Sequence, residues 1–383
     1  MIWFLVFTFV FYAILIGSLA IGFKNIDDYI PKNTKPETSF SVIIPFRNEA
    51  KNLPLLLKSI SALNYPNNLV EFILVDDASS DNSIEVINSF FSFIPNEERR
   101  ETFKNATRID IKVIKNVRIS NSPKKDAITT AIATARNSWI ITTDADCILP
   151  KNWLKILDNF IQNKNPNMVV APVNYKVENN FLEQFQLLDF MSMQGTTIGG
   201  FGINFPFLCN GANFAYKKTT FLELNGFKGN NNIASGDDIF LFEKFIKTDK
   251  KSVRYLKSQD AIVTTFPVKS WVNLMNQRTR WAAKTSSFSS LSVKLIGLLV
   301  LLTNAFVVYS ICVLPFKTMF VLFMLKMSID LLLFLPTIKF FKHQKNFYKW
   351  YVLASLWYPF FSVFIVFKSL FFNYNWKGRS FKK

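Results

Sequence analysis

Residues 139–150 read Trp-Ile-Ile-Thr-Thr-Asp-Ala-Asp-Cys-Ile-Leu-Pro. The first five residues predict a short buried strand, and two carboxylates, Asp144 and Asp146, follow where that strand should run out into a loop. Alternate residues of an extended backbone point the same way, so the two carboxylates can converge on one point. Close carboxylates favour a cation between them, and their hard oxygen atoms suit Mg²⁺ or Mn²⁺. A metal site that holds a phosphate-bearing substrate is one interpretation, and a loop with two solvated aspartates is the other.

Strands and helices alternate on either side of this stretch. The predicted strands are residues 39–45, 71–75, 109–113, 139–143 and 168–172, and the predicted helices are residues 52–63, 83–93, 127–136 and 153–162. This alternation indicates an α/β fold with a mostly parallel sheet, in which ligands bind beyond the carboxyl ends of the strands. Three polar segments follow such ends, at residues 45–49, 76–81 and 144–146. We expect these three segments to form one site.

The composition is too apolar for an ordinary soluble protein. Half of the 383 residues are hydrophobic, and Phe alone occurs 42 times. Residues 2–22 carry no charge and are long enough to cross a bilayer. Because a basic start and a clear cleavage site are missing, they predict an uncleaved anchor rather than a signal peptide. Three later stretches also have spanning length, namely residues 291–315, 318–341 and 350–372.

The net charge of +18 is concentrated beside the late apolar stretches. From Lys284 onward, 13 Lys and Arg stand against one acid, Asp330, whereas the first 283 residues hold 32 against 26. Basic residues that flank membrane spans follow the cytoplasmic-charge bias and attract anionic lipid head groups. We therefore expect a membrane partner and no nucleic acid. Lys326 and Asp330 stand four residues apart in the middle stretch, as either a buried pair or a snorkelling pair.

Cysteine and histidine are too few for several kinds of site. Cys147, Cys209 and Cys312 form no spaced motif, which argues against a disulfide framework and against a zinc site. His343 is the only histidine, and it lies in a basic stretch between two apolar segments. Any acid/base chemistry therefore falls to carboxylates.

Two acids stand at a predicted helix start in the second half of the chain. A Gly- and Asn-rich loop, residues 226–236, leads to Asp237 and Asp238, and a helix is predicted over residues 239–246. A general base is one interpretation of this pair, and acids that favour the positive end of a helix dipole are the other.

Two more predicted helices carry sequence patterns of interest. Residues 181–193 have a single apolar stripe, which predicts an interfacial amphipathic helix, with a core helix as the alternative. The helix over residues 271–284 places Gln277, Arg280 and Trp281 on one face.

Taken together, the residues resemble the membrane-embedded members of glycosyltransferase family 2. Five segments carry the resemblance in the family's order: Ser41-Val42-Ile43-Ile44-Pro45-Phe46-Arg47-Asn48-Glu49, Val75-Asp76-Asp77-Ala78-Ser79-Ser80-Asp81, Asp144-Ala145-Asp146, Gly236-Asp237-Asp238 and Gln277-Arg278-Thr279-Arg280-Trp281. The resemblance implies a GT-A fold, a nucleotide-diphosphate sugar donor and inversion at the anomeric carbon. A nucleotidyltransferase on a similar fold would need a Gly-rich phosphate loop after the first strand, which residues 45–49 do not provide.

The resemblance also implies roles for individual residues. Asp144 and Asp146 would hold Mg²⁺ or Mn²⁺ on the diphosphate, and Gln277, Arg280 and Trp281 would contact the acceptor or the diphosphate. Asp238 would be the general base, although the family's Glu-Asp pair is Asp237-Asp238 here, which leaves the choice between the two open. The donor would be bound by Pro45, Arg47, Glu49, Asp76, Asp77, Lys124, Lys125 and Asp144. For the two lysines, a solvated helix start is the alternative.

These implications predict a metal-dependent inverting glycosyltransferase that transfers a sugar to a membrane-associated, lipid-linked acceptor. One anchor and three later spans are few for a polymer channel, and the late architecture, which ends in Trp376-Lys377-Gly378-Arg379, looks similar to the ceramide and carotenoid glucosyltransferases. A processive polysaccharide synthase acting on a glycan is the first alternative. A catalytically inactive, membrane-bound nucleotide-sugar binding protein is the second.

The predicted organisation has four parts: an anchor at residues 1–23, a linker at 24–38, a GT-A catalytic domain at 39–284 with its interfacial helix at 181–200, and a membrane region at 285–383. The expected location is a cell membrane, in particular a bacterial inner membrane, with multiple spans. The catalytic domain should face the cytoplasm, because sugar nucleotides are cytoplasmic. The basic tail would then lie outside, against the charge bias, unless one late segment does not fully cross.

Overall fold

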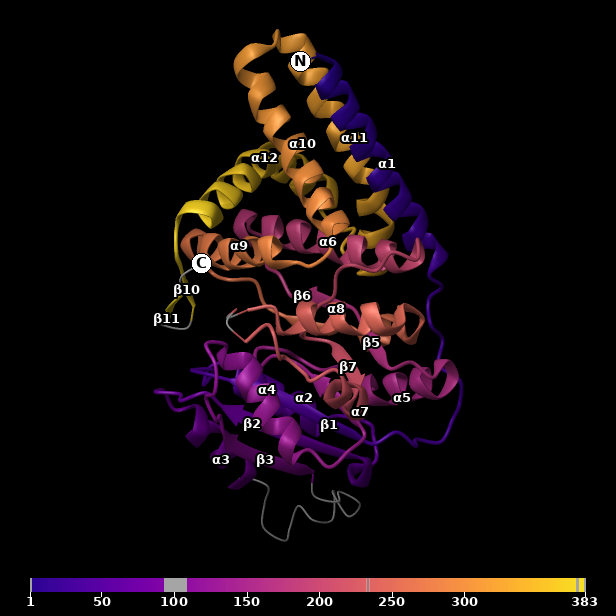
Figure 1. The fold of residues 1–383 in the computed structure, drawn as a ribbon, viewed down its shortest axis with the longest axis vertical. Helices are drawn as coiled ribbons and strands as arrows, with labels where there is room; N and C mark the ends of the chain where they lie inside the picture. Colours follow the sequence, from indigo (N-terminus) through magenta and orange to yellow (C-terminus); the bar gives the residue numbers. More distant parts are fainter. Residues whose placement is uncertain (1, 93–108, 232, 234, 377–378, 382–383) are drawn as a thin grey trace. The chain divides into compact units, whose positions relative to one another are not determined.

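The structure is a computed structural model that describes residues 2–92, 109–231, 233, 235–376 and 379–381. Its elements form two compact units, each assembled from separate parts of the chain (Figure 1). We call them the helical unit, Met1–Asp27, Tyr175–Leu208 and Pro267–Lys383, and the sheet unit, Asp28–Asn174 and Cys209–Phe266.

The sheet unit is built on a seven-stranded sheet with the strand order β3-β2-β1-β4-β7-β5-β8. The strands are β1 (Phe40–Phe46), β2 (Val70–Asp76), β3 (Asp110–Lys115), β4 (Trp139–Thr142), β5 (Met168–Val170), β7 (Phe214–Lys217) and β8 (Val253–Tyr255). Only β7 runs antiparallel to its neighbours, β4 and β5. The predicted α/β fold with a mostly parallel sheet is therefore confirmed. A two-stranded sheet is formed by β6 (Val173–Tyr175) and β9 (Val263–Thr265).

The central strands are mostly apolar, as expected where helices cover both faces of the sheet. Phe40, Val42, Ile43 and Ile44 of β1 are fully buried, as expected for parallel strands covered on both faces. The helices of this unit are α2 (Leu53–Ser61), α3 (Ser83–Ser92), α4 (Pro123–Thr134), α5 (Trp153–Lys164), α7 (Lys218–Glu223) and α8 (Asp237–Asp249). Short 3₁₀ turns lie at η1 (Asn67–Leu69), η3 (Lys250–Ser252) and η4 (Gln259–Ala261).

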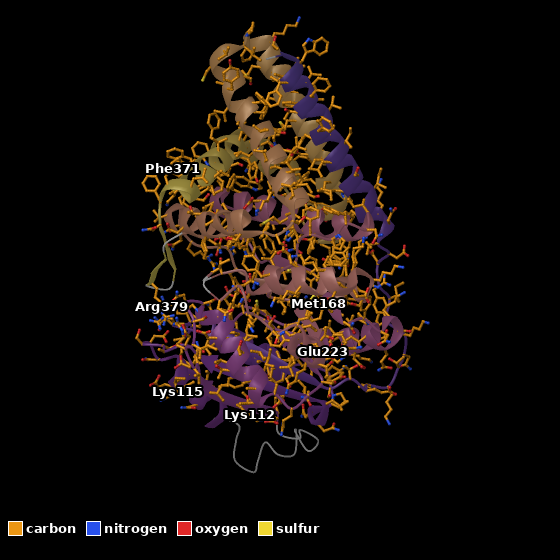
Figure 2. All side chains as sticks on the ribbon, in the orientation of Figure 1. Lys112, Lys115, Met168, Glu223, Phe371 and Arg379 are labelled. Carbon is orange, nitrogen blue, oxygen red and sulfur yellow. The ribbon has the colours of Figure 1, made fainter. Side chains whose placement is uncertain are left out.

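At one end of the sheet, β3 carries Lys112 and Lys115 (Figure 2). Lys112 reaches back over the sheet, and its Nζ lies 2.9 Å from Oε2 of the buried Glu71 on β2. Lysines on an edge strand oppose pairing with another chain, because a second strand would have to desolvate their charge.

The helical unit consists of α1 (Ile2–Asn25), α6 (Phe181–Gly202), α9 (Trp271–Ala283), η5 (Lys284–Ser287), α10 (Leu291–Val313), α11 (Phe316–Phe340) and α12 (Phe347–Phe371), followed by a hairpin of β10 (Tyr374–Trp376) and β11 (Arg379–Phe381). Among these, α1, α10, α11 and α12 are long and apolar enough to cross a membrane. They correspond to the four stretches that the sequence predicted.

The helix α6 is longer than the sequence predicted and is covered by protein. None of residues 181–200, all of which are described, is exposed, and α6 contacts α1, α11 and α12. Its glycines permit this close packing, because a Cβ on Gly199 or Gly202 would collide with the backbone of Leu19 or Gly22 on α1. The apolar side of α6 therefore packs on neighbouring helices, and its position at a membrane interface stays a prediction.

Candidate active site

The carboxyl ends of β1, β2 and β4 meet at one edge of the sheet. These strands are parallel neighbours, with Phe46 beside Asp76 and the Thr143 amide donating to the Ile43 carbonyl at 3.2 Å. Because β7 is antiparallel to β4 and places Phe214 opposite Thr142, the segment before β7 lies at the same edge. The structure thus brings together the strand-end segments that the sequence predicted, and it adds residues 209–213.

Hydrogen bonds connect the loops that follow β1 and β2. Arg47 donates through Nη1 to the carbonyls of Asp77 and Ala78, both at 2.7 Å. Asn48 and Ala78 have positive φ angles of 55° and 58°, and the Asn48 side chain accepts from the Ser80 amide at 2.8 Å. Arg47, which was predicted to bind the donor, therefore connects the two loops by hydrogen bonds in this structure.

The carboxylates of the second loop point in different directions. Asp76 accepts from the Ser79 amide at 2.9 Å, which closes the loop on itself. Asp77 accepts from the Asn116 side chain at 2.7 Å, and Nη1 of Arg118 lies 3.6 Å from its Oδ1. Neither Asn116 nor Arg118 was predicted to belong to the site. Both follow the carboxyl end of β3, so the rule that ligands bind beyond the carboxyl ends of parallel strands would have indicated them.

Other predicted residues of the first loop face the protein interior. Pro45 lies within β1 opposite Val75. Glu49 is 9% exposed and accepts from the Asn52 side chain at 2.6 Å, and its backbone amide donates to the Ser83 hydroxyl. Glu49 therefore stabilises the fold of the first loop in this structure.

Lys124 lies between two carboxylates at the start of α4. Its Nζ is 2.7 Å from Oδ1 of Asp144 and 3.2 Å from Oδ2 of Asp237. Burial opposes the charge of this ammonium group, but the carboxylates of Asp144 and Asp237 raise the pKa of Lys124 well above its usual value. The lysine is therefore a fixed cation that joins the strand-end loop of β4 to the start of α8.

The buried Asp126 holds the start of α4 in place. Its Oδ2 accepts from the amides of Ile119 and Ser120 at 3.2 Å and 3.0 Å, and its Oδ1 accepts from the Ser120 hydroxyl at 2.7 Å. Because these bonds tie the preceding loop to the first helical turn, they also set the direction from which Lys124 reaches Asp144.

Lys125 faces away from that pair of carboxylates. The residue is 1% exposed, and its Nζ donates to the carbonyls of Asn230 and Ile233 at 2.7 Å and 2.9 Å. The ammonium also lies 5.0 Å from the ring centre of Phe240 on α8. Lys125 therefore holds the Gly- and Asn-rich loop that leads to α8, while its prediction as a donor-binding residue stays untested.

Asp238 is held against the sheet edge by backbone amides. Its Oδ2 accepts from the Gly211 amide at 3.1 Å, and its Oδ1 accepts from the Ile239 amide at 2.8 Å. A Cβ on Gly211 would lie 3.1 Å from the Asp238 Cβ, so a larger residue there would press on Asp238. Gly236 begins the turn into α8 with a φ of 80°, a conformation that favours glycine.

The donor set at this edge fits a divalent cation that shares its ligands with a substrate. Asp144 has 41% of its side chain exposed, and Asp146 is half-buried. Within the described part of the chain, no group of three or more His, Cys, Asp and Glu side chains is arranged to hold a metal. Two carboxylates suffice for Mg²⁺, because it keeps several waters and binds substrate phosphates.

Two family models match the chain. Residues 41–223 match "Glycosyl transferase family 2", and residues 139–368, more than half of the chain, match "Glycosyl transferase family group 2". The chain belongs to glycosyltransferase family 2. Its predicted family is thereby confirmed.

Bacterial members of the family are similar over part of their length. The minor teichoic acid biosynthesis protein GgaA of Bacillus subtilis (strain 168) is 28% identical over 144 residues, 36% of this chain and 28% of GgaA. The poly-beta-1,6-N-acetyl-D-glucosamine synthase of Staphylococcus epidermidis is 25% identical over 158 residues, 40% of this chain and 33% of the synthase. The match spans about a third of the length of these relatives.

A solved structure is similar over nearly all of this family 2 glycosyltransferase. The mannosyltransferase PcManGT from Pyrobaculum calidifontis, in complex with GDP-Man and Mn²⁺, superposes with a TM-score of 0.56 at 16% identity. The likeness covers 96% of this chain and 97% of PcManGT. At this identity it shows a shared fold, which confirms the predicted GT-A fold.

The Gln-x-x-Arg-Trp residues of this family 2 member lie on α9, in the helical unit. Between the predicted Gln277 and Trp281 stands a residue that the sequence reasoning passed over, Arg278. Its Nε lies 2.5 Å from Oδ2 of Asp189, Nη1 donates to Gln277, and its guanidinium lies 4.1 Å from the Trp281 ring centre. Arg278 is 5% exposed, and although burial opposes its charge, Asp189 raises its pKa. Arg278 thus orders two of the three predicted side chains of this motif.

Proposed function

We propose that this family 2 member is a metal-dependent, inverting glycosyltransferase that moves a sugar from a nucleotide-diphosphate sugar to a membrane-associated, lipid-linked acceptor. The observation that carries the proposal is the position of Lys124, whose Nζ contacts Asp144 and Asp237. This contact connects the carboxylate predicted to bind the metal with the start of α8, where the general base is predicted. An inverting transfer needs the leaving-group site and the base close together, because the leaving group and the attacking group act on the same anomeric carbon from opposite faces.

On the donor side, Asp144 and Asp146 would hold the divalent cation, and Asp77 would border the nucleoside. When bound, the cation supplies positive charge where negative charge develops on the departing diphosphate. Lys124 supplies a second positive charge beside Asp144, and its raised pKa keeps it protonated at neutral pH. Arg118, whose guanidinium lies near Asp77, adds positive charge on the nucleoside side.

On the acceptor side, Asp238 is the proposed general base. It takes the proton of the acceptor hydroxyl as that oxygen forms a bond to the anomeric carbon and the bond to the diphosphate oxygen breaks. Two backbone amides bind its carboxylate, and such bonds favour the charged form that a base requires. Because Asp237 is occupied by the Lys124 ammonium, the geometry favours Asp238 over its neighbour.

The base assignment predicts that Asp238→Asn lowers the turnover rate of sugar transfer by a factor of about 10² to 10⁴, because the amide cannot accept the proton. Donor binding, measured by calorimetry with the sugar nucleotide and Mn²⁺, should stay within about threefold of wild type. Asp260→Asn, at an exposed position in η4, is the matched control. Wild-type turnover in Asp238→Asn would remove this residue from the mechanism.

The proposed lipid acceptor and membrane location are supported by the four helices of spanning length. Purified protein incubated with a labelled sugar nucleotide, Mn²⁺ and a membrane lipid extract should yield a single lipid-soluble product. A ladder of products would instead favour a processive polysaccharide synthase. The poly-beta-1,6-N-acetyl-D-glucosamine synthase among the relatives is the reason to test this alternative. Neither transfer nor hydrolysis with any of several sugar nucleotides would favour a binding protein that has lost catalysis.

A further inference from the structure

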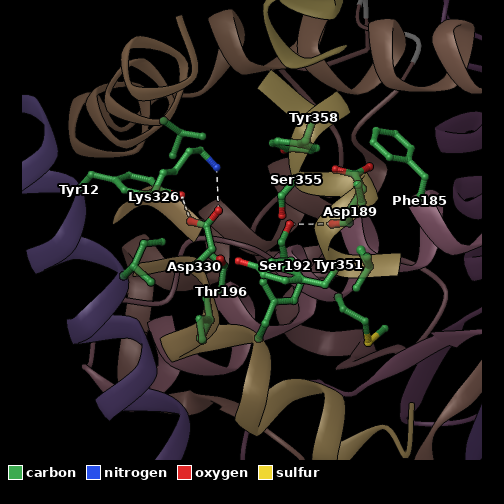
Figure 3. Close-up of a pocket in the computed structure, with 17 residues that line it drawn as sticks. Tyr12, Phe185, Asp189, Ser192, Thr196, Lys326, Asp330, Tyr351, Ser355 and Tyr358 are labelled. Atoms are coloured by element: carbon green, nitrogen blue, oxygen red, sulfur yellow. Dashed lines mark hydrogen bonds and ion pairs between the residues drawn. The ribbon is translucent and has the colours of Figure 1, made fainter. Parts of the chain in front are cut away.

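The helical unit contains a cavity of about 130 Å³ that the proposed chemistry does not use (Figure 3). Side chains of α1, α6, α10, α11 and α12 line it. Several of these helices have spanning length, yet polar side chains cluster in the cavity. Polar and charged groups among apolar helices are costly unless they are paired or serve a ligand.

The lysine in the cavity is paired within the protein. Lys326 is 4% exposed, and its Nζ lies 2.7 Å from Oδ2 of Asp330, one turn later on α11. The Tyr12 hydroxyl of α1 donates to the other oxygen of Asp330 at 2.6 Å, and the Lys326 ammonium lies 5.8 Å from the Tyr358 ring centre. Of the two interpretations of this pair, the structure therefore shows the buried one.

The second acid in the cavity, Asp189 of α6, is also neutralised. Arg278, whose Nε lies 2.5 Å from Asp189, supplies the opposite charge. Lys326, Asp330 and Asp189 are the charged residues among the described lining, so the cavity and its partners carry two positive and two negative charges. A site balanced in this way gives no net attraction to a phosphate head group.

The rest of the lining is divided between hydroxyl groups and apolar side chains. Ser192, Thr196, Ser355 and Tyr358 contribute hydroxyl groups, and Figure 3 shows them around the same space as Asp189 and Asp330. The apolar part includes Ile16, Leu188, Leu333 and Phe334. Because a water molecule occupies about 30 Å³ in the liquid, the cavity has room for about four waters, or for a group of a few carbon and oxygen atoms.

We propose that this cavity binds the uncharged, hydroxyl-bearing head group of a lipid, of about the size of glycerol. The Ser192 hydroxyl already donates to the Asp189 carbonyl at 2.7 Å, but its oxygen can still accept a hydrogen bond from such a head group, as can the other lining hydroxyls. The apolar side of the cavity suits the adjoining hydrocarbon. The proposal rests on the membrane location in the proposed function. It does not rest on that lipid being the sugar acceptor.

The proposal is tested by binding of tritiated 1-oleoylglycerol to the full-length protein, purified in a detergent whose head group carries no hydroxyl, such as lauryldimethylamine oxide. Unlabelled 1-oleoylglycerol should compete at least about tenfold better than oleyl phosphate or methyl oleate, which differ from it in charge and in hydroxyl groups. Equal competition by all three would show that the cavity holds only water or an acyl chain and would overturn the proposal. A preference of the wild type for oleyl phosphate would overturn it as well.

Matched variants locate the binding. Thr196→Val removes one hydroxyl group of the lining at nearly constant volume and should weaken 1-oleoylglycerol binding roughly three- to tenfold. Thr303→Val makes the same change at a buried threonine of α10 outside the cavity lining and should leave binding unchanged. Equal loss in both variants, or in neither, would contradict the assignment to this cavity.

A variant that removes one charge tests whether charge balance in the cavity causes the preference for a neutral head group. Asp330→Asn leaves Lys326 without its opposite charge and should shift the preference towards oleyl phosphate by about tenfold or more. If this variant does not fold, the Thr196→Val and Thr303→Val pair still decides the matter. Asp238→Asn should bind the lipid as the wild type does, so a failure of lipid binding and a failure of sugar transfer are observed separately.

Discussion

Lys124, which is partly buried, and Lys326, which is fully buried, both contact aspartate, but the charge around them differs. In the sheet unit, the Lys124 ammonium is shared by Asp144 and Asp237, so these three groups carry a net negative charge. In the helical unit, Lys326 pairs with Asp330 and Arg278 pairs with Asp189, so the charges cancel. The comparison indicates that a site with more carboxylates than basic groups favours a cation, whereas a site with equal numbers of both favours a neutral ligand.

The largest effect should come from breaking the balanced pair. Asp330→Leu leaves Lys326 buried without a counter-charge and should lower the free energy of unfolding by about 3–5 kcal/mol. The double variant Lys326→Met with Asp330→Leu should recover most of the loss, since apolar side chains of similar size replace an ion pair well. Unfolding in mixed micelles with increasing dodecyl sulfate measures both. A double variant as unstable as the single one would show that charge is not the cause.

Around Lys124, where carboxylates outnumber the lysine, removal of a carboxylate should impair metal binding and catalysis. Asp144→Asn should lower the transfer rate about a hundredfold or more and weaken Mn²⁺ binding in the presence of the sugar nucleotide, because one of two protein oxygen ligands is lost. Electron paramagnetic resonance of free Mn²⁺ reports the binding. Full activity after exhaustive chelation of the wild type would remove the metal from the proposed function.

Lys124 itself should oppose metal binding before the donor arrives. Lys124→Met removes the ammonium that contacts Asp144, so Mn²⁺ should bind the donor-free protein about tenfold more tightly, whereas sugar transfer should slow about tenfold or more. Lys125→Met is an informative comparison, because Lys125 contacts backbone carbonyls instead of carboxylates and its loss should not tighten Mn²⁺ binding. Unchanged Mn²⁺ affinity in Lys124→Met would mean that the lysine and the metal do not compete.

The smallest effect concerns a third lysine–carboxylate contact, between Lys112 and Glu71. Burial disfavours the Glu71 charge, but the Arg136 amide, Lys112 and the Ser41 hydroxyl lower the pKa of Glu71 below its ordinary value of 4.5. A lowered pKa in the folded state contributes stability above about pH 4.5, and this contribution is lost as the pH falls through the folded-state pKa.

Glu71→Gln should therefore lower the free energy of unfolding by about 1 kcal/mol at pH 7, with the difference disappearing at acid pH. Thermal unfolding between pH 3 and pH 7 tests this dependence. A difference that stays constant with pH would assign the loss to packing rather than to charge.

Much of the fold and part of the site could be predicted from local patterns. The run Phe40–Phe46 is a strand because its residues are apolar and β-branched, and α2 is a helix because Leu53, Leu56, Leu57 and Ile60 share one face. The reversed direction of β7 could not be predicted in this way, because its partners β4 and β5 lie more than forty residues earlier in the chain.

The sequence by itself determined the alternation of strands β1 to β5 with helices α2 to α5, the four apolar helices and the acids at the strand ends. These depend on neighbouring residues and on the common direction of parallel strands. Only the tertiary structure decided that Lys124 meets Asp144 and Asp237 while Lys125 binds a loop. It also decided that Arg278 neutralises Asp189, 89 residues away in the chain. The physical reason is that charge balance at a site depends on contacts between distant segments, which no local pattern contains.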